Sequence, residues 1–108
     1  MCAYTPVAGP EPTREEIDQR PGKTLLEFGA EHCPYCLAIQ GLLKKQLDAH
    51  PDITHIKVED GKGKPLGRSF RVKVWPTLVF LRDGKAEAQM SRAEESDIVG
   101  AFEALAKR

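Results

Sequence analysis

The residues of this chain best suited to chemistry are two cysteines separated by Pro34 and Tyr35. Cys33 and Cys36 are three positions apart, and two thiols at that spacing, in a chain where strands alternate with helices, can form and reopen a single disulfide. We expect a helix to begin here, because proline is favoured at the first helical position, where it leaves no N–H unsatisfied. The pattern therefore indicates thiol redox chemistry.

The helix that follows predicts different roles for the two thiols. Cys36 shares one apolar stripe with Ile39, Leu43 and Leu47 at helical spacing, so it should face the core. Cys33 lies at the expected N-cap, where unpaired backbone N–H groups and the positive end of the helix dipole favour a thiolate. We therefore expect Cys33 to be the exposed nucleophile and Cys36 to be the resolving thiol that attacks the mixed disulfide from beneath.

A Cys-X-X-Cys pair can also form half of a zinc site. A closed zinc site needs four ligands, and the remaining candidates, Cys2, His32, His50 and His55, form no second pair at a usual spacing. We therefore expect no metal and no cofactor other than the redox-active disulfide itself. Cys2 is interpreted as an incidental thiol and is given no role.

The composition narrows the range of partners. Among 108 residues, 16 basic and 16 acidic side chains cancel, which gives no general reason to expect binding to nucleic acid or to an anionic membrane. No stretch approaches the roughly 18 apolar residues of a membrane span, and the N-terminus has no leader pattern. We expect a cytoplasmic protein that acts as a monomer.

The elements that must position the dithiol follow from the hydrophobic pattern. Residues 1–12 predict an irregular segment or a short edge strand around Tyr4 to Val7, and residues 13–108 predict a single domain. Within the domain we expect, in order, a short helix opened by a Thr13–Glu16 capping box, a strand over 24–28, a helix over 34–49, a strand over 53–58, one or two helical turns over 66–70, strands over 77–81 and 85–90 joined by a turn at 83–84, and a last helix opened by a Ser91–Glu94 capping box. This order predicts an α/β layer sandwich on a mixed sheet.

Three segments, taken in order, resemble the thioredoxin superfamily. They are the strand and dithiol LEFGAEHCPYC at 26–36, the run FRVKVWPT at 70–77, and the Asp83-Gly84 hairpin. The resemblance covers roughly Thr13 to Leu105. It implies the thioredoxin fold, a three-layer α/β/α sandwich with a mixed central sheet of four to five strands and a C-terminal helix. It also implies a thiol–disulfide oxidoreductase that reduces protein or small-molecule disulfides.

The same resemblance assigns two residues near the dithiol. Pro76 should be a cis-proline opposite the cysteines, which places the backbone of Trp75 where it can pair with an extended substrate. Glu27 stands where thioredoxins carry a buried acid, so we expect it to relay a proton to or from Cys36 through water. The alternative is a glutamate at the strand edge that reaches solvent or pairs with Lys57.

Several side chains around the dithiol are candidates for substrate contact. Trp75 and Tyr35 are expected to form an aromatic rim, unless Trp75 only covers the sheet edge. His32, if protonated, would favour the Cys33 thiolate, and otherwise it is a solvated loop residue. A run of cations before Pro76 is suited to steering acidic partners or glutathione, unless these side chains are merely solvated: Lys62, Lys64, Arg68, Arg71 and Lys73.

The motif also departs from the family pattern. Thioredoxins usually read Trp-Cys-Gly-Pro-Cys, whereas Pro34 and Tyr35, both counted here as substrate-binding residues, match the pair found in glutaredoxins. The Thr-Val-Pro and following Gly-Gly motifs of glutaredoxins are absent. Val74-Trp75-Pro76 stands at the first, and Met90-Ser91-Arg92 stands near where a thioredoxin has its docking glycine. Three hypotheses follow: a dithiol reductase of disulfides recharged by thioredoxin reductase or glutathione, a glutathione-dependent reductase of mixed disulfides, and a redox-inert binding module.

Overall fold

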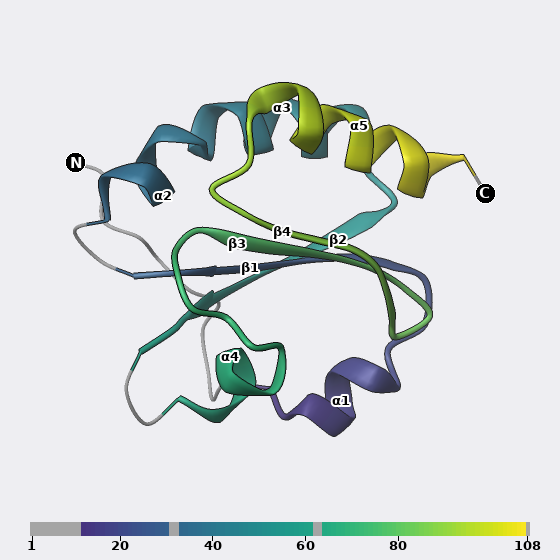
Figure 1. The fold of residues 1–108 in the computed structure, drawn as a ribbon. Helices are drawn as coiled ribbons and strands as arrows, with labels where there is room; N and C mark the ends of the chain where they lie inside the picture. The colour runs from purple at the N-terminus through teal and green to yellow at the C-terminus, as the bar shows by residue number, and fades with distance from the viewer. Residues whose placement is uncertain (1–11, 31–32, 62–63, 108) are drawn as a thin grey trace.

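The computed structural model describes residues 12–30, 33–61 and 64–107 of the chain. The predicted edge strand around Tyr4 to Val7, Cys2, His32 and Lys62 lie outside these residues. The elements, in chain order, are α1 (Arg14–Asp18), β1 (Lys23–Gly29), α2 (Pro34–Ala38), α3 (Gln40–Ala49), β2 (Ile53–Glu59), α4 (Pro65–Ser69), β3 (Thr77–Arg82), β4 (Lys85–Ser91) and α5 (Glu95–Ala106). The strands form one mixed sheet in the order β2-β1-β3-β4 (Figure 1).

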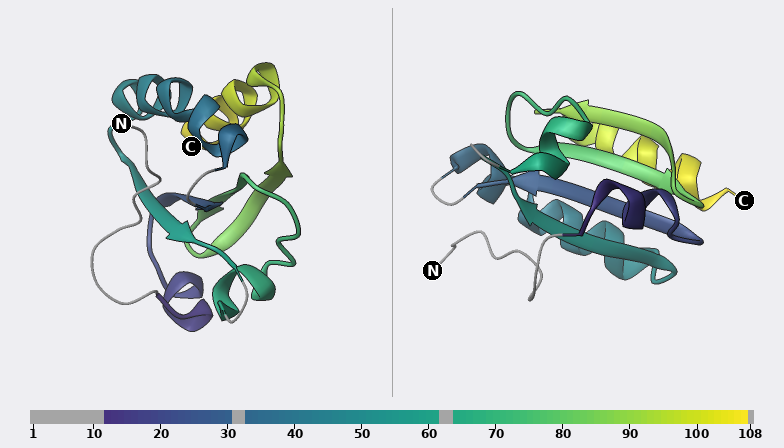
Figure 2. Two further views of the ribbon diagram at one scale, coloured as in Figure 1. Left: turned by 90° about the vertical axis from the view of Figure 1, so that its left-hand side faces the viewer. Right: turned by 90° about the horizontal axis from the view of Figure 1, so that it is seen from below.

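The sheet is covered on both faces. β1 and β2 are parallel and are joined through α2 and α3, whereas β3 runs antiparallel to both β1 and β4. Helices α2, α3 and α5 lie over one face of the sheet, and α1 and α4 lie under the other, as two perpendicular views agree (Figures 1 and 2). The predicted three-layer sandwich is confirmed, with four strands among the described residues.

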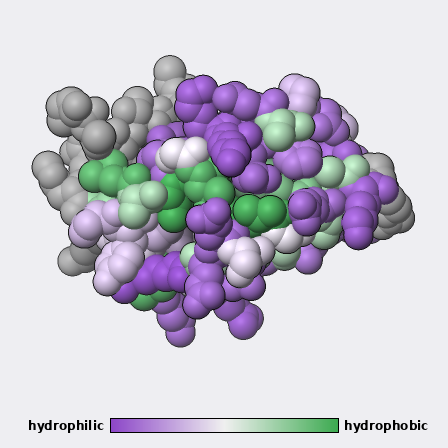
Figure 3. All heavy atoms as spheres, turned by 90° about the horizontal axis from the view of Figure 1, so that it is seen from above, coloured by the Kyte–Doolittle hydropathy of each residue, from purple (hydrophilic) through white to green (hydrophobic). Residues whose placement is uncertain are grey.

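The central strand explains why two hydrophobic cores can flank one sheet. Successive side chains of a strand point to opposite faces, and in β1 both faces are buried. Leu25 packs with Phe80 and Phe102 on the side of α3 and α5, whereas Leu26 packs with Ile17 on the side of α1 and α4. Seen from the α3 and α5 side, the outer surface is mostly hydrophilic, with a band of apolar residues across its middle (Figure 3). No helix of the described residues has the length and apolar character needed to span a membrane.

The helix expected over residues 34–49 is interrupted, and the prediction of one continuous helix is wrong. Ile39, with φ −94° and ψ −2°, separates α2 from α3. Next to the break, the side-chain amide of Gln40 donates to the Cys36 carbonyl over 2.7 Å. A side chain inserted among helical hydrogen bonds is a recognised cause of a kink, so the break is tied to Gln40.

Only one of the two predicted capping boxes forms. Thr13 Oγ1 accepts from the Glu16 amide over 3.0 Å, and Glu16 Oε1 accepts from the Thr13 amide over 2.8 Å. The box predicted at Ser91 and Glu94 is wrong, because α5 has Glu94 as its N-cap without a side-chain hydrogen bond. Ser91 instead ends β4, and its Oγ lies 2.7 Å from Oγ1 of Thr77 on the neighbouring strand. A contact across the sheet has replaced the local one.

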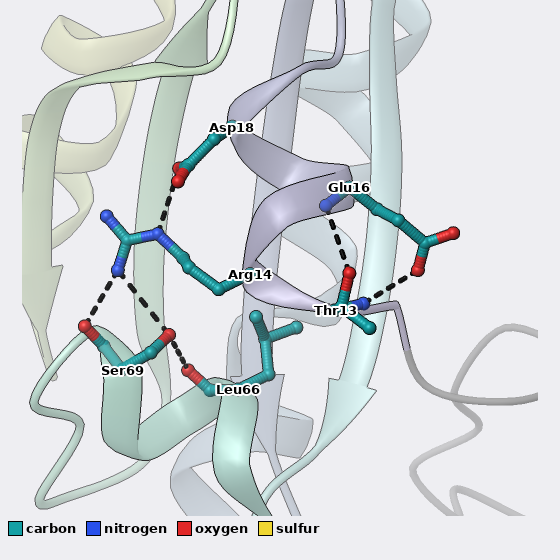
Figure 4. A network of polar contacts seen from close by, with 6 residues as sticks. All are labelled: Thr13, Arg14, Glu16, Asp18, Leu66 and Ser69. Atoms are coloured by element: carbon teal, nitrogen blue, oxygen red, sulfur yellow. Dashed lines mark hydrogen bonds and ion pairs between the residues drawn. The ribbon is translucent and has the colours of Figure 1, made fainter.

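Arg14 joins the two helices of the lower layer (Figure 4). It forms an ion pair with Asp18 at 2.9 Å, donates to the Ser69 carbonyl over 2.7 Å, and its guanidinium lies 3.9 Å from the ring centroid of Phe70. Because Ser69 is the last residue of α4, one side chain connects α1 with α4.

The β3–β4 turn also contacts α1. Asp83 and Gly84 have φ of 51° and 81°, which suits the predicted hairpin turn, and glycine adopts such angles without steric cost. A Cβ added to Gly84 would collide with the carbonyl oxygen of Asp18. The hairpin therefore requires glycine at this position for conformation and for space.

Candidate active site

The two thiols occupy the start of α2. Cys33 is the N-cap residue, its Sγ accepts from the Cys36 amide over 3.3 Å, and Pro34 follows at the first helical position, as predicted. Cys36 is fully buried, and Cys33 keeps 9% of its surface exposed. Cys33 is therefore less exposed than expected, because Trp75 packs against the pair. The order of exposure nevertheless leaves Cys33 as the thiol that a partner can reach.

The environment of Cys36 holds that thiol in its protonated form. Burial, then the hydrogen bond with Cys33, raises the pKa of Cys36 from 9.0 to about 12. Only a thiolate is an effective nucleophile. Cys36 therefore needs a nearby base that removes its proton at the moment when it attacks.

Glu27 is a buried acid whose charge acts on the Cys36 thiol. Its side chain is completely buried, so the alternative in which it reaches solvent is wrong. Its Oε1 lies 2.6 Å from Nε2 of His55, and its Oε2 accepts from Nε2 of Gln40 over 2.7 Å. The same amide of Gln40 donates to the Cys36 carbonyl, and Lys57 Nζ donates to Gln40 Oε1 over 2.9 Å. One partly buried polar network thus joins the buried carboxylate to the dithiol helix.

Neither Gln40 nor His55 had a role predicted from the sequence. In the parallel register, His55 stands opposite Leu25 and Lys57 opposite Glu27, so these side chains share the face of the sheet that lies under α2 and α3. Side chains alternate between the two faces along β2, so the sequence alone could have placed His55 and Lys57 on one face, but only the register of β2 against β1 sets them beside Glu27.

The predicted cis-proline is present. The peptide bond between Trp75 and Pro76 is cis, and Pro76 is buried at the start of β3. Trp75 packs against Cys33 and Cys36, and its indole Nε1 donates to Asp60 Oδ2 over 2.8 Å. Trp75 therefore forms part of the wall of the dithiol site.

Arg92, noted in the sequence only as part of a departure from the family pattern, contacts both aromatic residues of the predicted rim, Tyr35 and Trp75. Tyr35 is 55% exposed beside the cysteines, and the guanidinium of Arg92 lies 4.2 Å from its ring centroid. Arg92 Nε also donates to the Trp75 carbonyl over 2.8 Å. Arg92 thus bridges the two aromatic residues and donates to the carbonyl of Trp75, the residue whose backbone was expected to pair with an extended substrate.

Cations of the predicted basic stretch line a pocket to which Trp75 also contributes. The pocket has a volume of about 470 Å³ and is lined by Asp60, Gly61, Lys64, Arg68, Arg71, Val72, Lys73 and Trp75. Four of these residues are cations, while the carboxylate of Asp60 accepts from the Trp75 indole. An anionic group would be favoured here. Among the described residues, no cluster of three or more His, Cys, Asp or Glu side chains is arranged to hold a metal ion.

The chain is similar to proteins of known family. The family model described as Thioredoxin matches residues 8–104. This chain belongs to the thioredoxin family. It is 47% identical to thioredoxin 2 of Pseudomonas aeruginosa, whose reduced structure superposes with a TM-score of 0.80 over 94% of each chain. It is also 31% identical to Thioredoxin-1 of Caenorhabditis elegans over 83 residues, which are 76% of this chain and 72% of that protein.

These relatives confirm the resemblance and the thioredoxin fold, and they identify the chain as a thioredoxin-like disulfide reductase. Of the predicted site residues, the structure brings Cys33, Cys36, Glu27 and Trp75 together, with Pro34 and Tyr35 between the thiols, and Pro76 follows Trp75 through the cis peptide bond. His32 lies outside the described residues.

Proposed function

We propose that this protein reduces disulfides of client proteins, with Cys33 as the nucleophile, Cys36 as the resolving thiol and Glu27 as the base that serves Cys36. The observation that carries the proposal is the pairing of a thiol at the rim with a fully buried thiol whose pKa is raised to about 12 beside a buried carboxylate. In such a pair, one sulfur attacks the client disulfide and the other, chemically different sulfur releases the client.

The first step joins the client to the rim. Cys33 attacks one sulfur of the client disulfide, the Cys33–client bond forms, and the other client sulfur leaves as a thiolate that takes a proton from water. Tyr35 and Pro34 flank the nucleophile, and Trp75 and Pro76 face it. The backbone of Trp75 can pair with an extended client, for whose donors Arg92 competes at the Trp75 carbonyl.

The second step releases the client. Glu27 takes the proton of Cys36 through water, Cys36 attacks Sγ of Cys33, and the client leaves as a second thiolate. Because both sulfurs belong to one helix turn, resolution is unimolecular and proceeds at a high effective concentration. The oxidised protein then needs a thiol donor, which we propose to be thioredoxin reductase or glutathione, in the cytoplasm, with the protein acting as a monomer and using no cofactor.

The test is insulin reduction in dithiothreitol by the wild type and by Cys33→Ser and Cys36→Ser, each in a Cys2→Ser background. We expect both active-site variants to lose turnover, and Cys36→Ser mixed with insulin in the absence of dithiothreitol to accumulate a mixed disulfide. Equal rates for the three proteins would reject the proposal and favour the redox-inert binding module.

A second candidate, reduction of glutathione mixed disulfides, is favoured by the basic pocket beside Trp75. Glutathione carries two carboxylates, and the lining cations could pair with them. Turnover of a glutathionylated peptide with glutathione and glutathione reductase, but not with thioredoxin reductase, would select this function. The double variant Arg68→Ala, Arg71→Ala should then raise KM for that substrate.

A further inference from the structure

A polar path leads from the buried carboxylate of Glu27 on β1 to a partly exposed side chain on β2. Glu27 itself is inaccessible to solvent, whereas the His55 side chain, 2.6 Å away, is 25% exposed. His55 lines a cavity of about 400 Å³ together with Gln40, Leu43, Lys44, Leu47, Asp48 and Lys57. The imidazole thus touches the buried acid on one side and a space open to water on the other.

We propose that His55 is the residue through which the proton of Cys36 leaves the protein, a role that rests on the proposed dithiol mechanism. When Cys36 attacks, the Cys33–Cys36 bond forms, the Cys33–client bond breaks, and the client sulfur leaves with the electron pair. The proton of Cys36 passes to Glu27. His55 accepts a proton from Glu27 at Nε2 and releases one from Nδ1 to water in the cavity, so that Glu27 is ready for the next cycle.

An imidazole suits this position better than the neighbouring groups. It accepts a proton on one nitrogen while it donates from the other, which an ammonium or an amide cannot do near neutral pH. The charged and titratable groups that face the path are Cys36 from α2, Lys44 and Asp48 from α3, and Lys57 from β2. Lys44 and Asp48 form an exposed ion pair at 3.0 Å, and Lys57 donates to Gln40.

The place of His55 in the fold separates proton release from client binding. Among the strands of the described residues, β2 lies on one side of β1, whereas Pro76 and Arg92 belong to the β3–β4 side. Along β1, His55 is paired with Leu25, while the dithiol follows the far end of the strand at Gly29. A client seated over Cys33 therefore leaves the cavity at His55 open to water.

The test resolves the two steps with Ellman's disulfide in a stopped-flow instrument, in a Cys2→Ser background. The first thionitrobenzoate is released when Cys33 attacks, and the second is released when Cys36 resolves the adduct. We expect His55→Ala and His55→Gln to leave the first phase within about twofold of the wild-type rate and to slow the second by about tenfold or more near pH 7. His50→Ala is the matched control, since His50 stacks on Phe102 at the end of α3, and neither phase should change.

Imidazole added to the buffer distinguishes proton transfer from support of the structure. In His55→Ala, the removed ring leaves room beside the cavity, so imidazole should restore the second phase in proportion to its concentration. A second phase as fast as wild type in both His55 variants overturns the inference. A slow second phase that imidazole does not restore also overturns it, because His55 would then only position Glu27. If the wild type itself shows no second phase, the dithiol mechanism fails first and the inference fails with it.

Discussion

Cys36 should be among the least reactive thiols that a protein can carry, and the structure sets the size of the effect. With its pKa raised from 9.0 to about 12, the thiolate fraction of Cys36 at pH 8 falls about a thousandfold relative to the unfolded chain. A more basic thiolate is intrinsically more nucleophilic, which recovers about twentyfold at a Brønsted slope near 0.45. The net expectation is alkylation about fiftyfold slower than in the unfolded chain, before the complete burial of the side chain reduces access further.

The assay uses Cys2→Ser, Cys33→Ser, which leaves Cys36 as the single thiol. Burial is the first cause of the pKa shift and persists in this variant, although the contributions of the Cys33 thiol are lost. Iodoacetamide labelling of the native protein at pH 8 is compared with labelling in guanidinium chloride, and Cys2→Ser, Cys36→Ser provides the matched measurement for Cys33. Native labelling of Cys36 as fast as in denaturant would refute the reasoning, and so would slower labelling of Cys33 than of Cys36.

Three further outcomes follow from other contacts. Gly84→Ala should lower the free energy of unfolding, measured in urea, by about 1–3 kcal/mol, because φ is 81° and the new Cβ would collide with the backbone of α1. Gly41→Ala is the control: it lies in α3 with nothing within 4 Å of an added Cβ, so it should raise the free energy of unfolding by about 0.5–1 kcal/mol. Arg92→Ala should lower KM for an extended protein client by about two- to fivefold, since the Trp75 carbonyl becomes available; an unchanged KM would mean that Arg92 does not compete. Above pH 9 the unfolded state releases the proton of Cys36, whereas the folded state retains it up to about pH 12. The free energy of unfolding of the reduced protein should therefore fall by up to about 4 kcal/mol between pH 9 and pH 12, relative to that of Cys36→Ala. Parallel curves of unfolding free energy against pH for the two proteins would contradict this.

The features that sequence reasoning predicted correctly are those with a local signal. The apolar run of β3, the Asp83-Gly84 turn and the dithiol at a helix start each depend on neighbours within a few residues, and all appear as expected. The cis-proline followed from the resemblance, because Pro76 stands in a recognisable order of motifs.

The features that were missed arise from contacts across the sheet. Gln40 interrupts the helix while it binds a carboxylate of β1, and Ser91 leaves its expected capping position for a partner on β3. The contact between His55 and Glu27 depends on the register of β1 against β2, which neither strand specifies alone. Arg92 reaches Trp75 only because β4 returns beside the cis-proline.

The bridge that Arg14 makes between α1 and α4 extends the influence of the N-terminal helix as far as the thiols. Both helices have five residues, too few to persist alone in water, so we expect them to open and close as one cooperative unit in hydrogen exchange. The segment after α4 leads directly to Trp75, whose ring packs on the cysteines. A substitution that destabilises α1 should thus make Trp75, which packs beside Cys33, less rigid.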